Sequence, residues 1–257
     1  MTVLVTGATG TLGRHLLPAA LAADHTVRAL SRSPSPDGPA EWLRADLTTG
    51  DGLAEAFRGV DAVVHAATDP RQPEAVDVAG TRRVVQAAQA AGVGHVVYVS
   101  IVGVDRVPLG YYRAKAEAER IVEASGVAAT VLRAAQFHAF VDALLAGVAR
   151  VPLVLPVPRG VRLQPVAAAE VAARVVCALA DGPGGRVSDL AGPAVHPIET
   201  LADAWKAARG VSKPTVGLPV PGGVARALRD GATTAPDGDR GRVPWETYLR
   251  EAAPPAP

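Results

Sequence analysis

The amino-terminal stretch constrains this chain more than any other, because it joins an apolar run to regularly spaced glycines. Residues 2–6 (TVLVT) are mostly β-branched and apolar, and Gly7, Gly10 and Gly13 follow them before apolar residues recur at helical spacing. This order predicts a strand, a tight turn and a helix. Gly7 can adopt the positive φ of a turn at a strand end, Gly10 leaves its backbone open to close approach, and Gly13 lets the helix pack near the sheet.

The amino end of such a helix favours an anion, because its backbone N–H groups are free and the helix dipole is positive there. In the context of strand, turn and helix, the glycine spacing predicts that the turn holds the pyrophosphate of a dinucleotide. A glycine-rich turn without a ligand is the alternative interpretation. The residues of this stretch expected to contact the cofactor are Gly7, Thr9, Gly10, Thr11, Leu12 and Gly13.

Strand-like and helix-like segments alternate through the first 135 residues. Helices are expected near 11–22, 73–91 and 111–125, and strands at 26–30, 41–45, 61–67, 94–100 and 127–132. The alternation predicts an α/β fold with a doubly wound parallel sheet and right-handed crossovers. We expect this dinucleotide-binding core to span residues 1–135, a smaller α/β portion to span 136–250, and residues 251–257 to form a disordered tail. The polar, Gly- and Asp-rich segment 231–242 predicts a mobile loop.

The loop after the second expected strand (residues 31–34) is where such folds read the adenosine ribose. It holds no acidic residue to bind the 2′-hydroxyl of NAD, whereas Arg32 suits the 2′-phosphate of NADP. NADP(H) is therefore the preferred cofactor and NAD(H) a possible one; a solvated loop arginine is the alternative. Asp46, next to Leu47, either accepts from the adenine amino group or caps the following helix. The small Ala66 and Ala67 leave room for a ribose.

Tyr111 and Lys115 lie four residues apart on an expected helix, so they share one face. Ser100 ends the preceding strand at the edge where parallel sheets bind ligands. These three residues are the catalytic candidates. The Lys115 ammonium would lower the pKa of the phenol, Tyr111 would exchange a proton with the substrate oxygen, and Ser100 would hydrogen-bond that oxygen. Tyr112, about 100° around the helix, competes for the proton-donor role.

Composition excludes several functional classes. Lys+Arg number 26 against 25 for Asp+Glu, so net charge favours neither nucleic acid nor anionic lipid as a partner. Cys177 is the only cysteine, which fits a reducing cytoplasm, and its Ala- and Val-rich surroundings predict a small buried residue. His138 and Asp142 are spaced i, i+4 without a third ligand at metal spacing, so we interpret them as a helix-surface pair and expect no metal. No signal peptide or membrane span is expected.

Several motifs together carry a family resemblance over nearly the whole chain. They are TGATGTLG (6–13), DAVVHAAT (61–68), DVAGTRRVVQAAQAAGVGHVVYVS (77–100), YYRAKAEAE (111–119), LRAAQF (132–137), LQPVAAAEVAA (163–173) and PWETYL (244–249). The sequence resembles the atypical, NmrA-like branch of the short-chain dehydrogenase/reductase superfamily. The resemblance implies a Rossmann-like domain with a small C-terminal substrate-binding portion. It also implies cofactor contacts at the three glycines and Arg32, and catalysis by Ser100, Tyr111 and Lys115. Asp77 stands where many active relatives have Asn.

These observations predict a cytoplasmic NADP(H)-dependent oxidoreductase that reduces a carbonyl, enone or quinone-like small apolar molecule. Members of the NmrA-like branch that lack the tyrosine serve as NADP-sensing regulators, so a non-catalytic NADP(H) sensor is one alternative. The superfamily also contains isomerases, epimerases and dehydratases, so a non-redox isomerase, epimerase or cyclase is another. The expected partner is the small-molecule substrate, and the chain is expected to be a monomer or a homodimer.

Overall fold

The computed structural model describes residues 1–33 and 38–252 of the chain. Pro34, at the end of the expected ribose-reading loop, lies outside the described residues, as do residues 253–257 of the expected tail. Glu251, which we expected to begin that tail, instead ends a helix.

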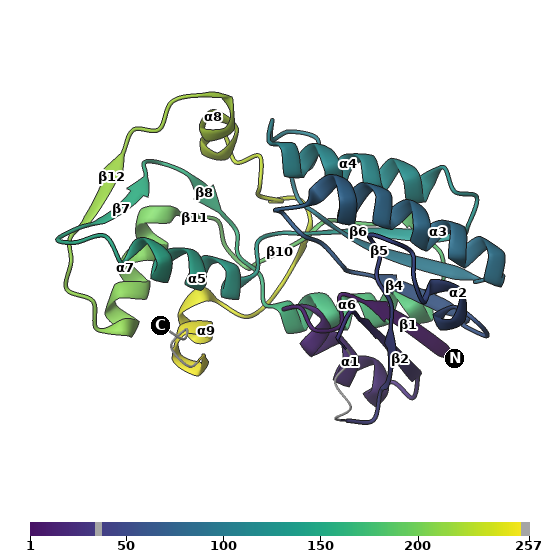
Figure 1. Cartoon of the computed structure of the whole chain (residues 1–257). Helices are drawn as coiled ribbons and strands as arrows, with labels where there is room; N and C mark the ends of the chain where they lie inside the picture. Colours follow the sequence, from purple (N-terminus) through teal and green to yellow (C-terminus); the bar gives the residue numbers. More distant parts are fainter. Residues whose placement is uncertain (34–37, 253–257) are drawn as a thin grey trace.

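A parallel sheet is the centre of the molecule (Figure 1). Its strand order is β3-β2-β1-β4-β5-β6-β10-β13, and β9 also pairs with β6. Because the chain runs outward from β1 to β3 and then crosses to β4 on the other side of β1, a crevice opens at the carboxyl ends of β1 and β4. The strands are β1 (Thr2–Thr6), β2 (Thr26–Ser31), β3 (Glu41–Arg44), β4 (Ala62–His65), β5 (His95–Ile101), β6 (Ala129–Ala134), β9 (Gly185–Arg186), β10 (Leu190–Ala191) and β13 (Asp239–Arg240).

Helices cover both faces of this sheet (Figure 1). Alternate side chains of β1 enter different cores: Val3 and Val5 pack in the cluster of α1 and α6, while Leu4 packs in the cluster of α2 and α3. Burial on both faces explains why the strands are apolar runs rather than alternating ones. The predicted doubly wound α/β fold is confirmed. The covering helices are α1 (Gly13–Ala22), α2 (Leu53–Ala56), α3 (Gly80–Ala91), α4 (Gly110–Glu123) and α6 (Ala168–Asp181).

The helix expected over 73–91 has an irregular first part. A π-helical segment, η1 (Glu74–Ala79), leads directly into α3, and the backbone stays helical at Ala79 and Gly80 while the hydrogen-bond spacing changes. The wider π turn rotates the side chains that precede α3, and Asp77 becomes the buried residue of this segment. Single π turns of this kind occur often at functional sites.

The second portion of the chain adds a small α/β layer beside the core (Figure 1). Its β7 pairs with β12 and its β8 pairs with β11, around a core that includes Leu145, Trp205 and Trp245. Three later strands, β9, β10 and β13, join the large sheet instead, and the later helix α6 packs against that sheet. The division of the chain at residues 135 and 250 stays a prediction. The elements of the small layer are α5 (His138–Val148), β7 (Leu155–Pro158), β8 (Arg162–Leu163), β11 (His196–Pro197), α7 (Ile198–Arg209), β12 (Thr215–Leu218), α8 (Gly223–Arg229) and α9 (Trp245–Glu251).

The structure corrects several expectations about single segments. The segment 231–242 is not a mobile loop: Thr233 is 0% exposed, Ala235 N donates to Gln164 Oε1 at 2.9 Å, and β13 pairs with β10. Cys177 is exposed rather than buried, because it lies on the outer face of α6. No helix in the described part of the chain combines the length and apolarity that crossing a membrane requires.

His138 and Asp142 do not form a surface pair, because both face the core of the small layer. Asp142 accepts hydrogen bonds from Trp205 Nε1 at 2.6 Å, from Arg209 at 2.8 Å and from Tyr248 at 3.1 Å. Its carboxylate is thus occupied by structural donors from α7 and α9. Within residues 1–33 and 38–252, no cluster of three His, Cys, Asp or Glu side chains is arranged to hold a metal ion.

Candidate functional site

One cavity of about 1360 Å³ follows the carboxyl ends of the central strands and continues into the small layer. Its wall includes the glycine-rich turn, the end of β2, the end of β4, the end of β5 and the start of α4. The expected site residues that line it are Gly7, Thr9, Gly10, Thr11, Leu12, Arg32, Asp46, Leu47, Ala66, Ala67, Ser100, Tyr111 and Lys115. Gly13 lies behind the turn rather than on the cavity wall.

The glycines of the turn are required by its backbone. Gly7 has a φ of +71°, and a Cβ there would lie 2.8 Å from the backbone of Ala66 and Ala67. A Cβ at Gly13 would overlap the carbonyl oxygens of Gly7 and Ala8, so the helix packs as closely as predicted. Gly10 N donates to Gly7 O at 3.0 Å and closes the turn. The result is a compact cradle at the amino end of α1 whose shape and dipole fit a pyrophosphate.

Thr6 supports this cradle from below, a role the sequence analysis did not foresee. Its Oγ1 accepts from the backbone N–H groups of Ala66 and Ala67 at 3.2 Å and contacts His65 Nδ1 at 2.7 Å. On the other side of the ring, His65 Nε2 contacts Thr81 Oγ1 at 2.9 Å. Burial lowers the pKa of His65 to about 3, with the Lys115 charge adding to the effect, so the ring stays neutral.

Arg32 and Asp46 lie on the same stretch of the cavity wall, at the ends of β2 and β3. Asp46 accepts from the backbone N–H and the hydroxyl of Thr48, both at 2.7 Å. These hydrogen bonds, with the nearby Arg32 charge, hold the pKa of Asp46 below its usual value. The helix-capping interpretation of Asp46 is wrong, because α2 begins at Leu53 after Gly52 without a side-chain cap, and Asp46 instead closes the turn at Thr48. The same residue also lines the cavity.

Tyr111 reaches the cavity wall from the first turn of α4, where its hydroxyl lies 3.0 Å from Thr68 Oγ1. Thr68 in turn donates to Asp77 Oδ1 at 2.6 Å. Burial raises the pKa of Tyr111 to about 12; the Thr68 hydrogen bond opposes the rise, and the negative charge of Asp77 adds to it. A phenol with this pKa is protonated near neutral pH.

Lys115 is oriented by partners other than the phenol. Its Nζ donates to Val99 O at 3.0 Å, lies 3.7 Å from Asp77 Oδ1 and sits 4.4 Å from the centre of the Tyr98 ring. Burial lowers the pKa of Lys115 to about 8, against the opposing charges of Asp77 and Glu119. The expected lowering of the Tyr111 pKa by Lys115 is wrong, because burial raises the phenol pKa and the charge of Asp77, which lies 3.7 Å from Lys115 Nζ, adds to the rise.

Ser100 and Tyr112 complete the polar part of the cavity wall. Ser100 is 1% exposed, and its Oγ has no hydrogen-bond partner among the described residues, so it is available to a ligand. Tyr112 also faces the cavity, with its ring edge-on to that of Tyr111 at 6.0 Å. Both tyrosines thus lie at the site, and Tyr111 is the one that reaches the Thr68 hydroxyl.

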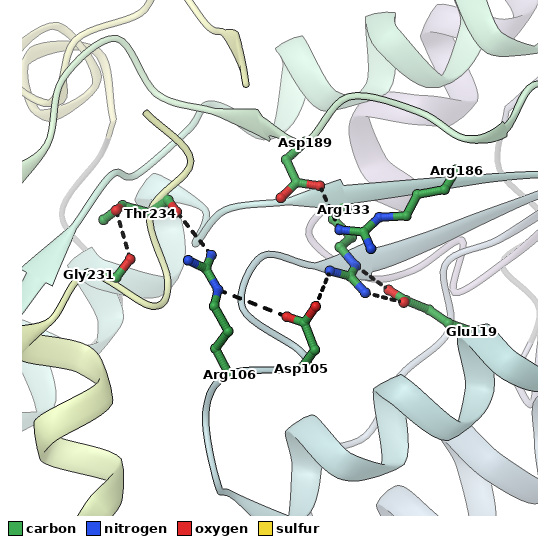
Figure 2. Close-up of polar contacts among 8 residues, drawn as sticks. All are labelled: Asp105, Arg106, Glu119, Arg133, Arg186, Asp189, Gly231 and Thr234. Atoms are coloured by element: carbon green, nitrogen blue, oxygen red, sulfur yellow. Dashed lines mark hydrogen bonds and ion pairs between the residues drawn. The ribbon is translucent and has the colours of Figure 1, made fainter. Parts of the chain in front are cut away.

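An ion-pair cluster fixes the loop that delivers Tyr111 (Figure 2). Arg133 of β6 donates to both carboxylate oxygens of Glu119, at 2.8 and 2.6 Å, and to Asp105 in the loop at 3.2 Å. Arg106 of the same loop donates to the carbonyl oxygen of Thr234 at 3.3 Å. The loop before α4 is therefore tied to β6 on one side and to the segment after α8 on the other.

The far end of the cavity is apolar. Leu109, Phe140 and Leu144 line it and stay 44%, 57% and 41% exposed. Val224 and Leu228 of α8 form the facing wall. The charged residues among the described lining are Arg32, Asp46, Asp69 and Lys115, and none belongs to this apolar end.

Fold and site together define a dinucleotide-binding Rossmann protein whose cavity has a polar wall. In agreement, residues 7–182 match the NAD(P)H-binding protein family. The chain belongs to this family.

Curated relatives resemble part of this chain in sequence. The 3 beta-hydroxysteroid dehydrogenase/Delta 5-->4-isomerase of Mycobacterium tuberculosis is 38% identical over 114 residues, which cover 38% of this chain and 31% of that protein. The chain spans about a third of the length of the first curated relatives that it matches.

Two solved structures resemble the fold over almost its whole length. A nucleoside-diphosphate-sugar epimerase from Staphylococcus aureus has a TM-score of 0.78 at 21% identity, covering 98% of this chain and 100% of that one. An NADPH-dependent quinone oxidoreductase from Escherichia coli, in complex with NADPH, has a TM-score of 0.73 at 23% identity, covering 91% of this chain and 88% of that one. At these identities the likeness concerns the fold.

Proposed function

We propose that this protein is an NADP(H)-dependent oxidoreductase that reduces a carbonyl, enone or quinone carbonyl on a small apolar molecule. The observation that carries the proposal is one continuous cavity, which joins the phosphate cradle at Gly7 to the hydroxyls of Ser100 and Tyr111 and then to an apolar end. A cofactor site, a proton donor and a substrate wall are thus contiguous. The proposed partner is that small-molecule substrate.

The cofactor would lie along the strand ends. The cradle at the amino end of α1 would hold its pyrophosphate, and Ala66 and Ala67 would lie beneath the nicotinamide ribose. Arg32 would pair with a 2′-phosphate, which favours NADPH over NADH. When bound, the reduced nicotinamide supplies the hydride.

The chain's own residues would manage the substrate oxygen. Tyr111 would give it a proton, and the free hydroxyl of Ser100 would donate a second hydrogen bond to stabilise developing negative charge. Lys115, held by Val99 O and Asp77, would face the ribose from below. This lysine then acts as a cofactor ligand rather than as the group that acidifies the phenol.

The apolar end of the cavity narrows the substrate class. A nucleoside diphosphate sugar needs cationic or hydrogen-bonding partners for its phosphates, and the described lining offers no charged side chain at this end. Hydrocarbon-rich ketones and quinones fit Leu109, Phe140 and Leu144 better. The name of the mycobacterial relative, a hydroxysteroid dehydrogenase, and that of the quinone oxidoreductase are consistent with such substrates.

The test is the oxidation of NADPH, followed at 340 nm, with a panel of apolar ketones, enones and quinones. We expect turnover in the wild type and a loss of about 100-fold or more in kcat for Tyr111→Phe, since a positioned acid contributes about 10²–10⁴ in rate. Tyr248→Phe is the matched control, because this hydroxyl donates to Asp142 outside the cavity. Tight NADPH binding without turnover of any compound would reject the proposal and favour a cofactor sensor.

A further inference from the structure

The hydrogens between Tyr111, Thr68 and Asp77 can be assigned from geometry. Thr68 has one hydroxyl hydrogen, and it lies on the 2.6 Å bond to Asp77 Oδ1, because a carboxylate can only accept. Thr68 Oγ1 therefore has only lone pairs for Tyr111, so the 3.0 Å contact is a bond that the phenol donates. A directed chain runs from the phenol through the threonine hydroxyl to the carboxylate.

The end of this chain is a buried carboxylate. Asp77 is 1% exposed in the π-helical segment η1 and also accepts from Asp69 N at 3.2 Å. The ionisable groups that face it or its cation are Lys115 and Glu119 from α4, Tyr98 from β5, Tyr111 and His65. Lys115, at 3.7 Å, balances the negative charge of Asp77.

We propose that Asp77, acting through Thr68, is the proton reservoir for Tyr111, and that both are positioning residues for proton transfer at the substrate oxygen. The inference rests on the proposed function. It assigns the acid–base role to a linked set of three residues instead of to a phenol acidified by Lys115. Asp77 thus has a function of its own.

The proton steps balance in both directions. In the oxidation of an alcohol, three protons move along the chain. The O–H proton of the alcohol passes to the Tyr111 oxygen, the phenol proton passes to Thr68, and the Thr68 proton passes to Asp77. At the same time the C–H bond of the alcohol breaks, and its hydrogen leaves with the electron pair as hydride to the oxidised nicotinamide. In carbonyl reduction the same bonds form and break in reverse, and the proton that returns through Thr68 to Tyr111 is replaced from solvent at the exposed Thr68.

A relay suits this site because a free phenolate does not. Burial raises the pKa of Tyr111 to about 12, so ionising the phenol alone is unfavourable near neutral pH. When the three protons move together, the phenol gains one proton as it loses another and stays neutral. The charge change then falls on Asp77, beside the Lys115 ammonium.

The first experiment measures the chain without turnover. The phenol of Tyr111 is titrated by absorbance at 295 nm, as the difference between each protein and its Tyr111→Phe counterpart. Asp77→Asn should lower the pH at which Tyr111 ionises, because the negative charge that adds to the raised phenol pKa is removed. Glu74→Gln, which removes an exposed charge from the same η1 segment, should leave it unchanged.

The second experiment measures kcat and KM for variants of Thr68. Thr68→Val should lose about 100-fold in kcat with KM within about threefold, and Thr68→Ser should restore most of it. A kcat for Thr68→Val within twofold of wild type, with Tyr111→Phe inactive, would overturn the relay and leave the proposed function standing. If no compound is turned over, the proposed function fails. Independently of turnover, the relay is overturned if Tyr111 ionises at the same pH in wild type and in Asp77→Asn.

Discussion

Replacing Gly7 by Ala tests whether the shape of the cofactor cradle is fixed by backbone sterics. The matched control is Gly92→Ala, because Gly92 has nearly the same φ, +69° against +71°, but nothing within 4 Å of its added Cβ. At Gly92 the left-handed backbone costs about 1–2 kcal/mol for a residue with a Cβ, offset by about 0.4–1 kcal/mol from the less flexible unfolded chain. We expect the control to lose about 1 kcal/mol of unfolding free energy.

Gly7→Ala carries an additional steric cost. The new Cβ would lie 2.8 Å from backbone atoms of Ala66 and Ala67, whose N–H groups are held by Thr6 Oγ1. Overpacking against fixed backbone costs about 1–3 kcal/mol, so the total loss should reach about 2–4 kcal/mol. The cradle also has to widen, so NADPH affinity should fall in Gly7→Ala and not in Gly92→Ala.

Urea denaturation gives the two stability changes, and calorimetric titration with NADPH gives the two affinities. Both variants should unfold in a single transition, so that their midpoints can be compared at equal slopes. Equal losses of stability in Gly7→Ala and Gly92→Ala would refute the steric argument. An unchanged NADPH affinity in Gly7→Ala would refute the placement of the pyrophosphate at this turn.

Three further predictions follow from the site and its supports. Arg32→Ala should weaken NADPH binding by about 10- to 100-fold, because a charge-assisted hydrogen bond to the 2′-phosphate is worth about 1.5–3 kcal/mol. NADH has no 2′-phosphate, so its binding should stay unchanged, and parallel titrations with the two cofactors check this. Glu119→Ala should lower the unfolding free energy by about 3–5 kcal/mol, because the buried Arg133 would keep only its bond to Asp105. The double variant Glu119→Ala with Arg133→Met should regain most of this loss, and urea denaturation compares the two. His65 should contribute a fall of about 1.4 kcal/mol per pH unit in unfolding free energy as pH drops from about 6.5 toward 3, because unfolding lets its neutral ring take up a proton. Burial of His138, which lowers its pKa to about 4, adds to this fall, and a flat profile would contradict the buried neutral state of both rings.

Much of the fold follows from local sequence patterns. The strand, glycines and helix at the amino terminus predict the phosphate cradle, and the alternation of apolar runs with helical patterns predicts the parallel sheet. The spacing of Tyr111 and Lys115 predicts that they share the inner side of α4, and both line the cavity. These features depend on residues close together in the chain, so their periodicity and spacing are visible in the sequence.

What the sequence left undecided depends on contacts between distant segments. The tie between Thr68 and Tyr111 arises only when β4 and α4 meet at the sheet edge, and the π turn that buries Asp77 has no clear local signal. Burial of the phenol, with the charge of Asp77 adding to it, reversed the expected shift of the Tyr111 pKa. The ordering of segment 231–242 likewise involves the pairing of β13 with β10. The sequence by itself determined which chemical groups this protein carries and on which elements they lie. Only the tertiary structure decided which group neutralises which, because a charge in a buried site responds to its nearest partners in space rather than along the chain.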